Sequence, residues 1–295
     1  MTEPTSGILY VLYPLQGILM IAIGIVWGVV LTRKFALSWR LYALGAITFV
    51  LSQVVHIPLN SLLTTLFQKG ILPAPPPAWK LPFNAITLGF TAGLCEEVAR
   101  YCVYRWWAKD ARSWRKGMLF GAGHGGIEAI ILGGLVLFAF FQMVVLRTAD
   151  LSTMVPADQL DLARQQVSDF WSAKWYMPFL GVFERFFTLP VHVGLSLIVL
   201  QVFTRKQIRW LWLAIGWHML IDALAVFIMP TWGVFAAEAT VFVVGCLSLV
   251  WIWRLYRPEP AETSAEPPPP PLTAEDLIPI AETTETLQDT RYTER

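Results

Sequence analysis

Two of the four histidines in the chain stand one helical turn from an acidic residue. His124 precedes Glu128 by four residues, and His218 precedes Asp222 by the same interval. Residues four apart lie on one face of a helix, so each imidazole can contact its carboxyl partner. A carboxylate that takes a proton, beside an imidazole that gives one, supplies the base and the acid needed to split a peptide bond with water.

A pair of adjacent glutamates is followed by an arginine at helical spacing. Glu96 and Glu97 lie four and three residues before Arg100, so the guanidinium can reach either carboxylate. One arginine neutralises only one of them, and the other must be protonated or take part in chemistry. Taken alone, this set could equally be a buried structural ion pair.

These residues lie within long apolar blocks. The chain of 295 residues is 56% hydrophobic and 15% charged, whereas soluble domains average roughly 45–50% apolar and about 25% charged residues. Each block has the ~20 residues that a helix needs to cross a bilayer. The composition excludes a soluble globule and predicts an all-α fold, a polytopic transmembrane helix bundle. About seven spans are expected, over residues 7–31, 41–66, 82–107, 117–147, 177–203, 209–229 and 232–256.

The basic residues indicate how the bundle lies in the membrane. They gather in alternate connections, which by the positive-inside rule places the N-terminus outside and the C-terminus in the cytoplasm. Residues 1–257 carry a net charge of +8 and form the bundle. Residues 258–295 hold nine acids, two bases and a proline run, a composition that predicts a disordered cytoplasmic tail. The sequence therefore indicates a multi-pass cell-membrane protein that contacts the lipid bilayer and no nucleic acid.

The polar residues inside the spans fall at one depth. Counted from the predicted cytoplasmic ends at about 1.5 Å per residue, Glu96, His124, His192 and His218 lie roughly 10–17 Å below that face. Charged groups are costly at this depth unless they have internal partners or a wet cavity. We therefore expect these four side chains, which come from four helices, to converge on one polar cavity.

Two other features are interpreted more plainly. Gln53, His56 and Asn60 form a stripe that is assigned to packing or to cavity lining. The segment from Leu160 to Trp171 has apolar residues at helical spacing with acids between them, as in an amphipathic helix at the membrane interface. That helix could be a cap over the bundle or a gate for substrate entry.

Three motifs on successive spans resemble those of a known superfamily. Glu96-Glu97-x-x-Arg100, Phe120-x-x-x-His124 and His218-x-x-x-Asp222 look like the motifs of the CAAX-protease and bacteriocin-processing (CPBP) superfamily of intramembrane endopeptidases. The Gly-His-Gly-Gly-Ile-Glu run that ends at Glu128, together with His192, is similar to its YhfC branch. The resemblance covers about residues 80–257, the motif-bearing core of the bundle.

The resemblance implies roles for the first two motifs. Glu96 or Glu97 would be the general base, and the spacing to Arg100 is one residue shorter than in the common motif, which leaves both glutamates open. Arg100 would orient the acid pair. His124 would share the water or protonate the leaving amine.

The last motif would hold the oxyanion. His218 and Asp222 occupy the oxyanion positions, and His192 falls where a further polar motif residue is expected. Asp222 stands where asparagine is usual, and an ionised carboxylate would repel an oxyanion. Asp222 must therefore be protonated, paired with His218, or in another role.

Three functions are compatible with these residues. The first is an intramembrane endopeptidase of the glutamic type, without a cofactor, that cleaves a membrane-associated protein or peptide. The second is a metal-dependent form of the same reaction, because several side chains could bind a divalent metal such as zinc. Those ligands would be His124, Glu128, His192, His218 and Asp222. The third is a non-catalytic membrane scaffold or a proton-linked transporter that uses the same cavity.

Overall fold

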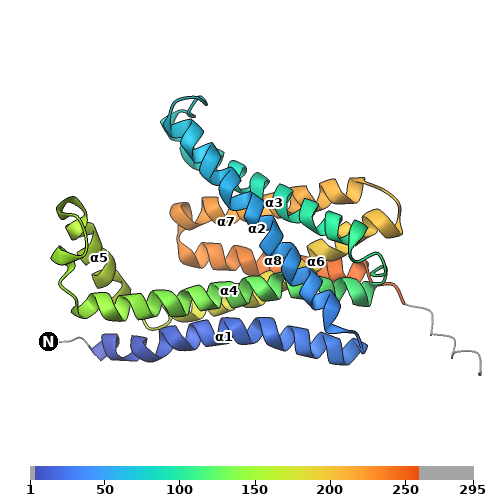
Figure 1. The fold of residues 1–295 in the computed structure, drawn as a ribbon, viewed down its shortest axis with the longest axis horizontal. Helices are drawn as coiled ribbons and strands as arrows, with labels where there is room; N and C mark the ends of the chain where they lie inside the picture. The colour runs from blue at the N-terminus through green and yellow to red at the C-terminus, as the bar shows by residue number, and fades with distance from the viewer. Residues whose placement is uncertain (1–3, 259–295) are drawn as a thin grey trace, which may run out of the picture. The chain divides into compact units, whose positions relative to one another are not determined.

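The computed structural model describes residues 4–258, and every regular element in that range is helical. The elements are α1 (Pro4–Phe35), α2 (Trp39–Gln68), η1 (Pro77–Trp79), α3 (Lys80–Trp106), α4 (Trp114–Thr148), η2 (Leu151–Thr153), η3 (Ala157–Gln159), α5 (Leu160–Trp171), α6 (Met177–Thr204), α7 (Arg209–Trp232) and α8 (Val234–Arg254) (Figure 1). This architecture confirms the predicted all-α fold. The predicted tail, 258–295, lies outside the described residues except for its first position.

Within the described range, six helices are long and apolar enough to cross a membrane: α1, α2, α4, α6, α7 and α8. The seventh expected span, α3, is long enough at 27 residues, but its ionisable residues make it less apolar than the other six. Glu96, Glu97 and Arg100 are at most 6% exposed. Because these charges face neighbouring helices, α3 can lie in the bundle despite its composition.

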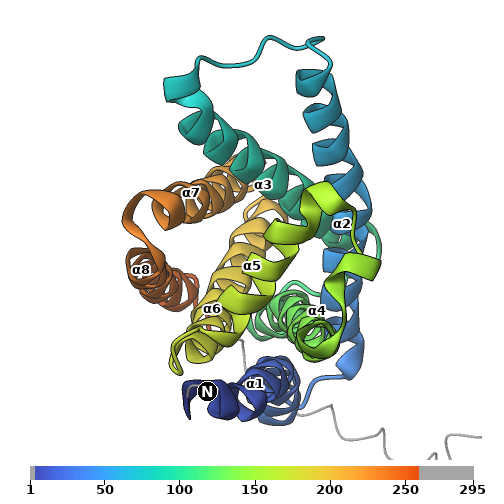
Figure 2. The ribbon, with the colours of Figure 1, turned by 90° about the vertical axis from the view of Figure 1, so that its left-hand side faces the viewer.

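Helix α6 occupies the centre of the bundle. Of its most apolar stretch, 78% is buried, compared with 17–33% for the other five apolar helices. The end-on view shows α1, α3, α4, α7 and α8 arranged around it (Figure 2). Any side chain on α6 that points toward α3 or α4 is therefore shielded from lipid, which is the setting that a buried histidine such as His192 requires.

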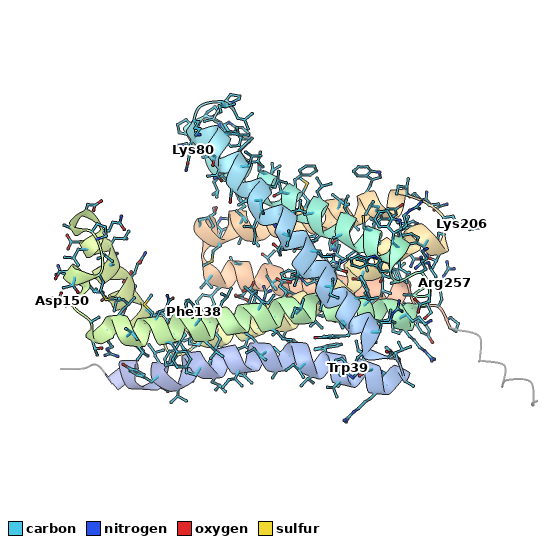
Figure 3. All side chains as sticks on the ribbon, viewed as in Figure 1. Trp39, Lys80, Phe138, Asp150, Lys206 and Arg257 are labelled. Carbon is cyan, nitrogen blue, oxygen red and sulfur yellow. The ribbon has the colours of Figure 1, made fainter. Side chains whose placement is uncertain are left out.

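The basic connections gather at one end of the bundle. Lys206 and Arg257 lie there, and Asp150 lies at the opposite end (Figure 3). At the basic end, Arg40 contacts Asp110 at 3.2 Å. The basic connections thus lie at the same end of the bundle, as their alternation along the sequence predicts. Which side of the membrane that end faces stays a prediction.

Glycines allow α2 and α4 to touch through their backbones. A Cβ on Gly45 of α2 would collide with the carbonyl oxygen of Phe120, and one on Gly123 of α4 with the carbonyl oxygen of Tyr42. Close backbone approach at small residues is typical of membrane helix pairs. Next to this contact, a Cβ on Gly125 would lie 3.1 Å from the ring of His192. The glycine run around His124 therefore serves both helix packing and the space around the histidines.

Replacing Gly123 by alanine is expected to destabilise the bundle by about 1–3 kcal/mol, the usual range for overpacking, because the rigid carbonyl of Tyr42 cannot move aside. The matched control is Gly134→Ala on the same helix, where no atom lies within 4 Å of the added Cβ. The control is expected to change stability by less than about 1 kcal/mol. Thermal unfolding of the two variants in detergent measures the difference, and equal melting temperatures would contradict the close contact.

The amphipathic segment forms α5 and packs onto the ends of α1 and α4. Trp171 is 6% exposed, and its ring stacks on Tyr10 with centroids 4.4 Å apart. Phe170 stacks on Tyr13 at 4.1 Å. These aromatic contacts favour the interpretation of this helix as a cap over α1 and α4.

Candidate active site

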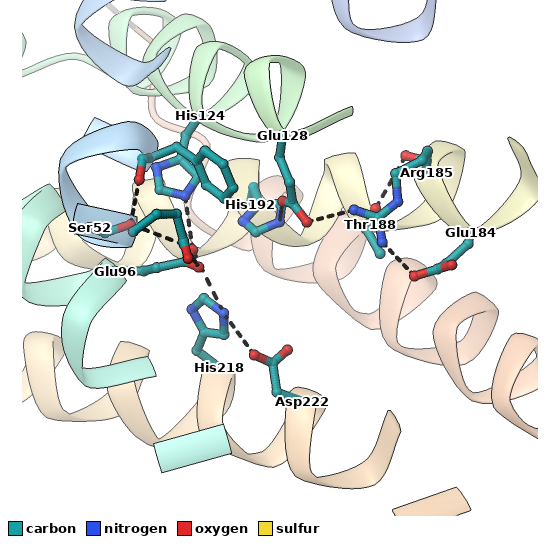
Figure 4. Close-up of polar contacts among 12 residues, drawn as sticks. Ser52, Glu96, His124, Glu128, Glu184, Arg185, Thr188, His192, His218 and Asp222 are labelled. Atoms are coloured by element: carbon teal, nitrogen blue, oxygen red, sulfur yellow. Dashed lines mark hydrogen bonds and ion pairs between the residues drawn. The ribbon is translucent and has the colours of Figure 1, made fainter. Parts of the chain in front are cut away.

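The centre of the polar cluster is a pair formed by Glu96 of α3 and His124 of α4. The Oε2 atom of Glu96 lies 2.9 Å from Nε2 of His124. Glu96 is 6% exposed and His124 is fully buried. Glu96 lies between His124 and His218, which belongs to α7 (Figure 4). A carboxylate in contact with an imidazole in a buried setting is an acid–base pair.

Glu97 points to a different set of partners. Its Oε1 atom pairs with the guanidinium of Arg100 and lies 2.6 Å from Nδ1 of His218. All three residues are at most 3% exposed. The two adjacent glutamates share Arg100 and His218 but differ in their closest partners: Glu96 contacts His124 at 2.9 Å and lies 3.7 Å from Arg100, whereas Glu97 is bound directly by Arg100 and His218.

His192 of α6 has both ring nitrogens engaged. Its Nδ1 atom accepts from Nη2 of Arg100 at 2.9 Å, because a guanidinium can only donate. Its Nε2 atom lies 2.6 Å from Oε2 of Glu128. These partners assign the proton of the neutral ring to Nε2, with the lone pair on Nδ1 toward Arg100. The ring centroid lies 5.2 Å from that of His124.

Arg185 of α6 anchors Glu128 from the other side. Its Nη1 atom donates to Glu128 at 2.6 Å, and its Nη2 atom donates to Glu184 at 2.5 Å. Arg185 is 7% exposed. The sequence interpretation placed Glu128 in the site but left Arg185 out. The signal was available, since an arginine inside an apolar span needs a carboxylate partner.

His218 and Asp222 remain together as predicted by their spacing. The Nε2 atom of His218 lies 3.5 Å from Asp222 and 3.9 Å from Oε2 of Glu96. The side chain of Asp222 is 38% exposed, the largest exposure among the eight predicted site residues. Of the three alternatives left open for Asp222, this placement corresponds to pairing with His218.

Gln53 of α2 also belongs to the site. Its Nε2 atom donates to Oε1 of Glu96 at 3.0 Å, so the two carboxylate oxygens of Glu96 face α2 and α4 respectively. The sequence interpretation assigned Gln53 to packing or cavity lining. Its proximity to Glu96 depends on how α2 crosses α3, which no spacing within α2 reveals.

The structure brings together all eight predicted site residues, Glu96, Glu97, Arg100, His124, Glu128, His192, His218 and Asp222, in one network of contacts. Among the described residues, the group best placed to hold a metal ion is Glu96, His124 and His192, whose ligand atoms all lie within 4.8 Å of one another. Two histidines and a glutamate are a common zinc ligand set. This group includes Glu96, which the sequence-based ligand set did not contain, and omits Glu128, His218 and Asp222.

The second layer of the network is also compatible with a metal. A ligating histidine commonly gives its other N–H to a carboxylate, and Glu128 is in that position beside His192 at 2.6 Å. The Nδ1 atom of His124 is buried and has no hydrogen-bond partner, so this ring keeps a free donor atom. The donor types thus fit a divalent cation, and binding it through Nδ1 of His192 would displace the hydrogen bond that this nitrogen accepts from Arg100.

Comparison with known proteins places the chain in a family. Residues 18–244 match the family described as YhfC intramembrane metalloprotease. The chain is 28% identical over 249 residues to a protein of Bacillus subtilis (strain 168) described as "Uncharacterized membrane protein YhfC", with 79% of this chain and 90% of that relative covered. No solved structure gives a significant match. The family match runs from α1 to α8 and includes every residue of the network, so this chain is a multi-pass membrane protein that belongs to the YhfC intramembrane metalloprotease family.

Proposed function

We propose that this chain is an intramembrane endopeptidase of the CPBP superfamily that hydrolyses a peptide bond in a membrane-associated protein or peptide. The observation that carries the proposal is the contact of 2.9 Å between Glu96 and His124, both buried among the helices of the bundle. We further propose that the N-terminus lies outside and the C-terminus in the cytoplasm. The cluster would then lie nearer the cytoplasmic face.

In this mechanism Glu96 is the general base. It takes a proton from a water molecule whose oxygen bonds to the carbonyl carbon of the scissile peptide. The bond from that carbon to nitrogen then breaks, and the departing nitrogen receives a proton from His124 or through Glu96. One water is consumed, and the products are one new carboxyl group and one new amine. Glu96 is favoured over Glu97 because it contacts His124 and is 6% exposed, whereas Glu97 is fully buried and bound directly by Arg100.

The other residues position charge around the reacting carbonyl. Arg100 and Glu97 hold His218 through its Nδ1 atom, at 2.6 Å from Glu97. The Nε2 atom of His218 then faces Glu96, and a proton on that nitrogen would donate to the developing oxyanion. Asp222, 3.5 Å from the same nitrogen, would stabilise the positive charge of a His218 ring protonated on both nitrogens and would not touch the oxyanion itself.

A metal-dependent form of this chemistry is the second version of the proposal. Glu96, His124 and His192 would hold the cation, as their mutual distances within 4.8 Å allow. A bound divalent cation supplies Lewis acidity toward the carbonyl oxygen and makes a bound water easier to deprotonate. Glu128 would then fix the orientation of the His192 ring through its Nε2 atom, and Arg185 would hold Glu128 in place.

One observation favours a different class of function. An unbroken series of contacts links Glu184, through Arg185, Glu128, His192 and Arg100, to Glu97 and His218. Buried carboxylate–histidine pairs such as Glu128 with His192 and Glu97 with His218 also take part in proton relays in transporters, although the arginines between them keep their protons. A proton-linked transporter is therefore kept as the alternative, with a membrane scaffold that binds partners through the same cluster.

The proposal is tested by counting new peptide termini in native membranes. Membranes containing the wild-type chain are expected to show cleavage products that are absent with His124→Ala and present with Asn84→Ala, an exposed residue of α3. Mass spectrometry of terminal peptides measures them at matched protein levels. Products that vanish in chelator and return with zinc would establish the metal-dependent version. Identical termini in all samples, together with proton flux in vesicles, would overturn proteolysis in favour of transport.

A further inference from the structure

One face of α2 carries a polar groove that the mechanism above does not use. The groove has a volume of about 520 Å³ and is lined by Gln53, His56, Ile57, Asn60, Ser61 and Thr64. We call it the α2 groove. It follows a single face of the helix, from the level of Glu96 toward the end of α2 at Gln68.

The polar side chains of the α2 groove form a hydrogen-bond chain that ends on Glu96. Thr91 of α3 donates to Oδ1 of Asn60 at 2.9 Å, and Nδ2 of Asn60 donates to Nε2 of His56 at 2.8 Å. That leaves the proton of His56 on Nδ1, which lies 3.3 Å from Oε1 of Gln53. Gln53 in turn donates to Glu96 at 3.0 Å. From Asn60 onward, each donor thus points toward the carboxylate of Glu96.

The opposite face of the same helix is apolar at the same depth. Val55 and Leu62 are 59% and 55% exposed there, as expected for side chains in contact with lipid. Amide and imidazole groups are costly to expose to hydrocarbon. The two faces of α2 thus differ in chemistry: the groove face carries polar groups that bond to α3 and to one another and can also bond to water, whereas Val55 and Leu62 cannot.

We propose that the α2 groove is a hydrated vestibule that conducts water to Glu96. This inference rests on the proposed hydrolysis, which consumes one water for each bond cut at a pair that is 6% and 0% exposed. The hydrogen-bond chain orients the carboxylate that would receive that water, because its last donor, Gln53, holds the Oε1 atom of Glu96 while Oε2 faces His124.

The vestibule is tested by thiol labelling, which needs no substrate and no proteolysis. The native free cysteines Cys95, Cys102 and Cys246 are first replaced by alanine in the full chain. Single cysteines are then introduced in two matched pairs, one member in the groove and one on the lipid face. The pairs are His56→Cys with Val55→Cys and Asn60→Cys with Leu62→Cys. A charged methanethiosulfonate reagent attacks only thiolates that water reaches.

Both groove cysteines are expected to react at least about ten-fold faster than their lipid-facing partners, because the thiolate is the reacting form. Thr64→Cys, nearer the open end and exposed, is expected to react at least as fast as His56→Cys. If His56→Cys or Asn60→Cys fails to fold, Ser61→Cys takes its place, because it is an exposed and nearly isosteric change in the same groove. Equal rates within each pair, or a slower Thr64→Cys, would overturn the vestibule.

The outcome of the labelling experiment can be distinguished from the outcome of the test for proteolysis. A labelled groove in a chain that cleaves nothing would leave the vestibule standing and remove the protease. An unlabelled groove in a chain that still cleaves its substrates would remove the vestibule and leave the protease.

Discussion

Replacing Glu96 by glutamine is expected to lower the rate of peptide cleavage by about 10²–10⁴, the usual contribution of a general base, while leaving the melting temperature nearly unchanged. Glutamine has the same shape as glutamate, and its amide oxygen can still accept from Gln53 while its amide nitrogen donates to Nε2 of His124, whose proton then lies on Nδ1. It cannot take a proton from water. The measurement is the number of wild-type cleavage products that persist in membranes containing the variant.

The matched control is Glu97→Gln at the neighbouring position. Because Glu97 is fully buried against Arg100 and His218, its neutralisation is expected to lower the melting temperature as well as the activity. Comparing Glu96→Gln with Glu97→Gln thus distinguishes the loss of a catalytic base from the loss of a stabilising ion pair. Full cleavage with Glu96→Gln, or loss of folding in that variant and not in Glu97→Gln, would reverse the two assignments.

Replacing Arg100 by methionine is expected to destabilise the bundle by about 3–5 kcal/mol, as when one partner of a buried ion pair is removed. Arg100 is fully buried, pairs with Glu97 and donates to His192 at 2.9 Å. Methionine fills similar volume but leaves the charge of Glu97 without its main partner. Unfolding in graded denaturing detergent, followed by tryptophan fluorescence, measures the loss.

Arg105→Met on the same helix is the control for this change. Arg105 is exposed, and its nearest polar contact is the hydroxyl of Tyr101 at 3.4 Å. Its replacement is expected to alter stability by less than about 1 kcal/mol, because exposed polar contacts contribute little. If both arginine variants unfolded at the same detergent fraction, Arg100 would not be the anchor of the buried network.

The sequence allowed the depth of the cluster to be predicted. Helical rise is fixed at about 1.5 Å per residue, so counting from the span ends is enough to put Glu96, His124, His192 and His218 at one level. The structure indeed brings their side chains together, with the rings of His192 and His218 centred 6.0 Å apart. The fold class followed from the same apolar blocks.

Contacts between helices could not be predicted in the same way. Which side chain meets which depends on how each helix is rotated about its axis and on the angle at which helices cross, and tertiary packing sets both. Gln53 meets Glu96 across 43 positions of sequence, and Arg185 meets Glu128 across 57. The choice between Glu96 and Glu97 is of this kind too, since adjacent residues of a helix point about 100° apart.

The central position of α6 decides which parts of the molecule can move during a catalytic cycle. His192 lies on a helix whose most apolar stretch is 78% buried, compared with 28% for α2 and for α7. Shifting α6 would disturb its packing against α1, α3, α4, α7 and α8 at once, whereas a movement of α2 would disturb mainly its contacts with α3 and α4. We therefore expect a bulky substrate to enter by displacement of α2 or α7 and not of α6. Compounds that bind between these outer helices and prevent their movement are therefore expected to inhibit the protein.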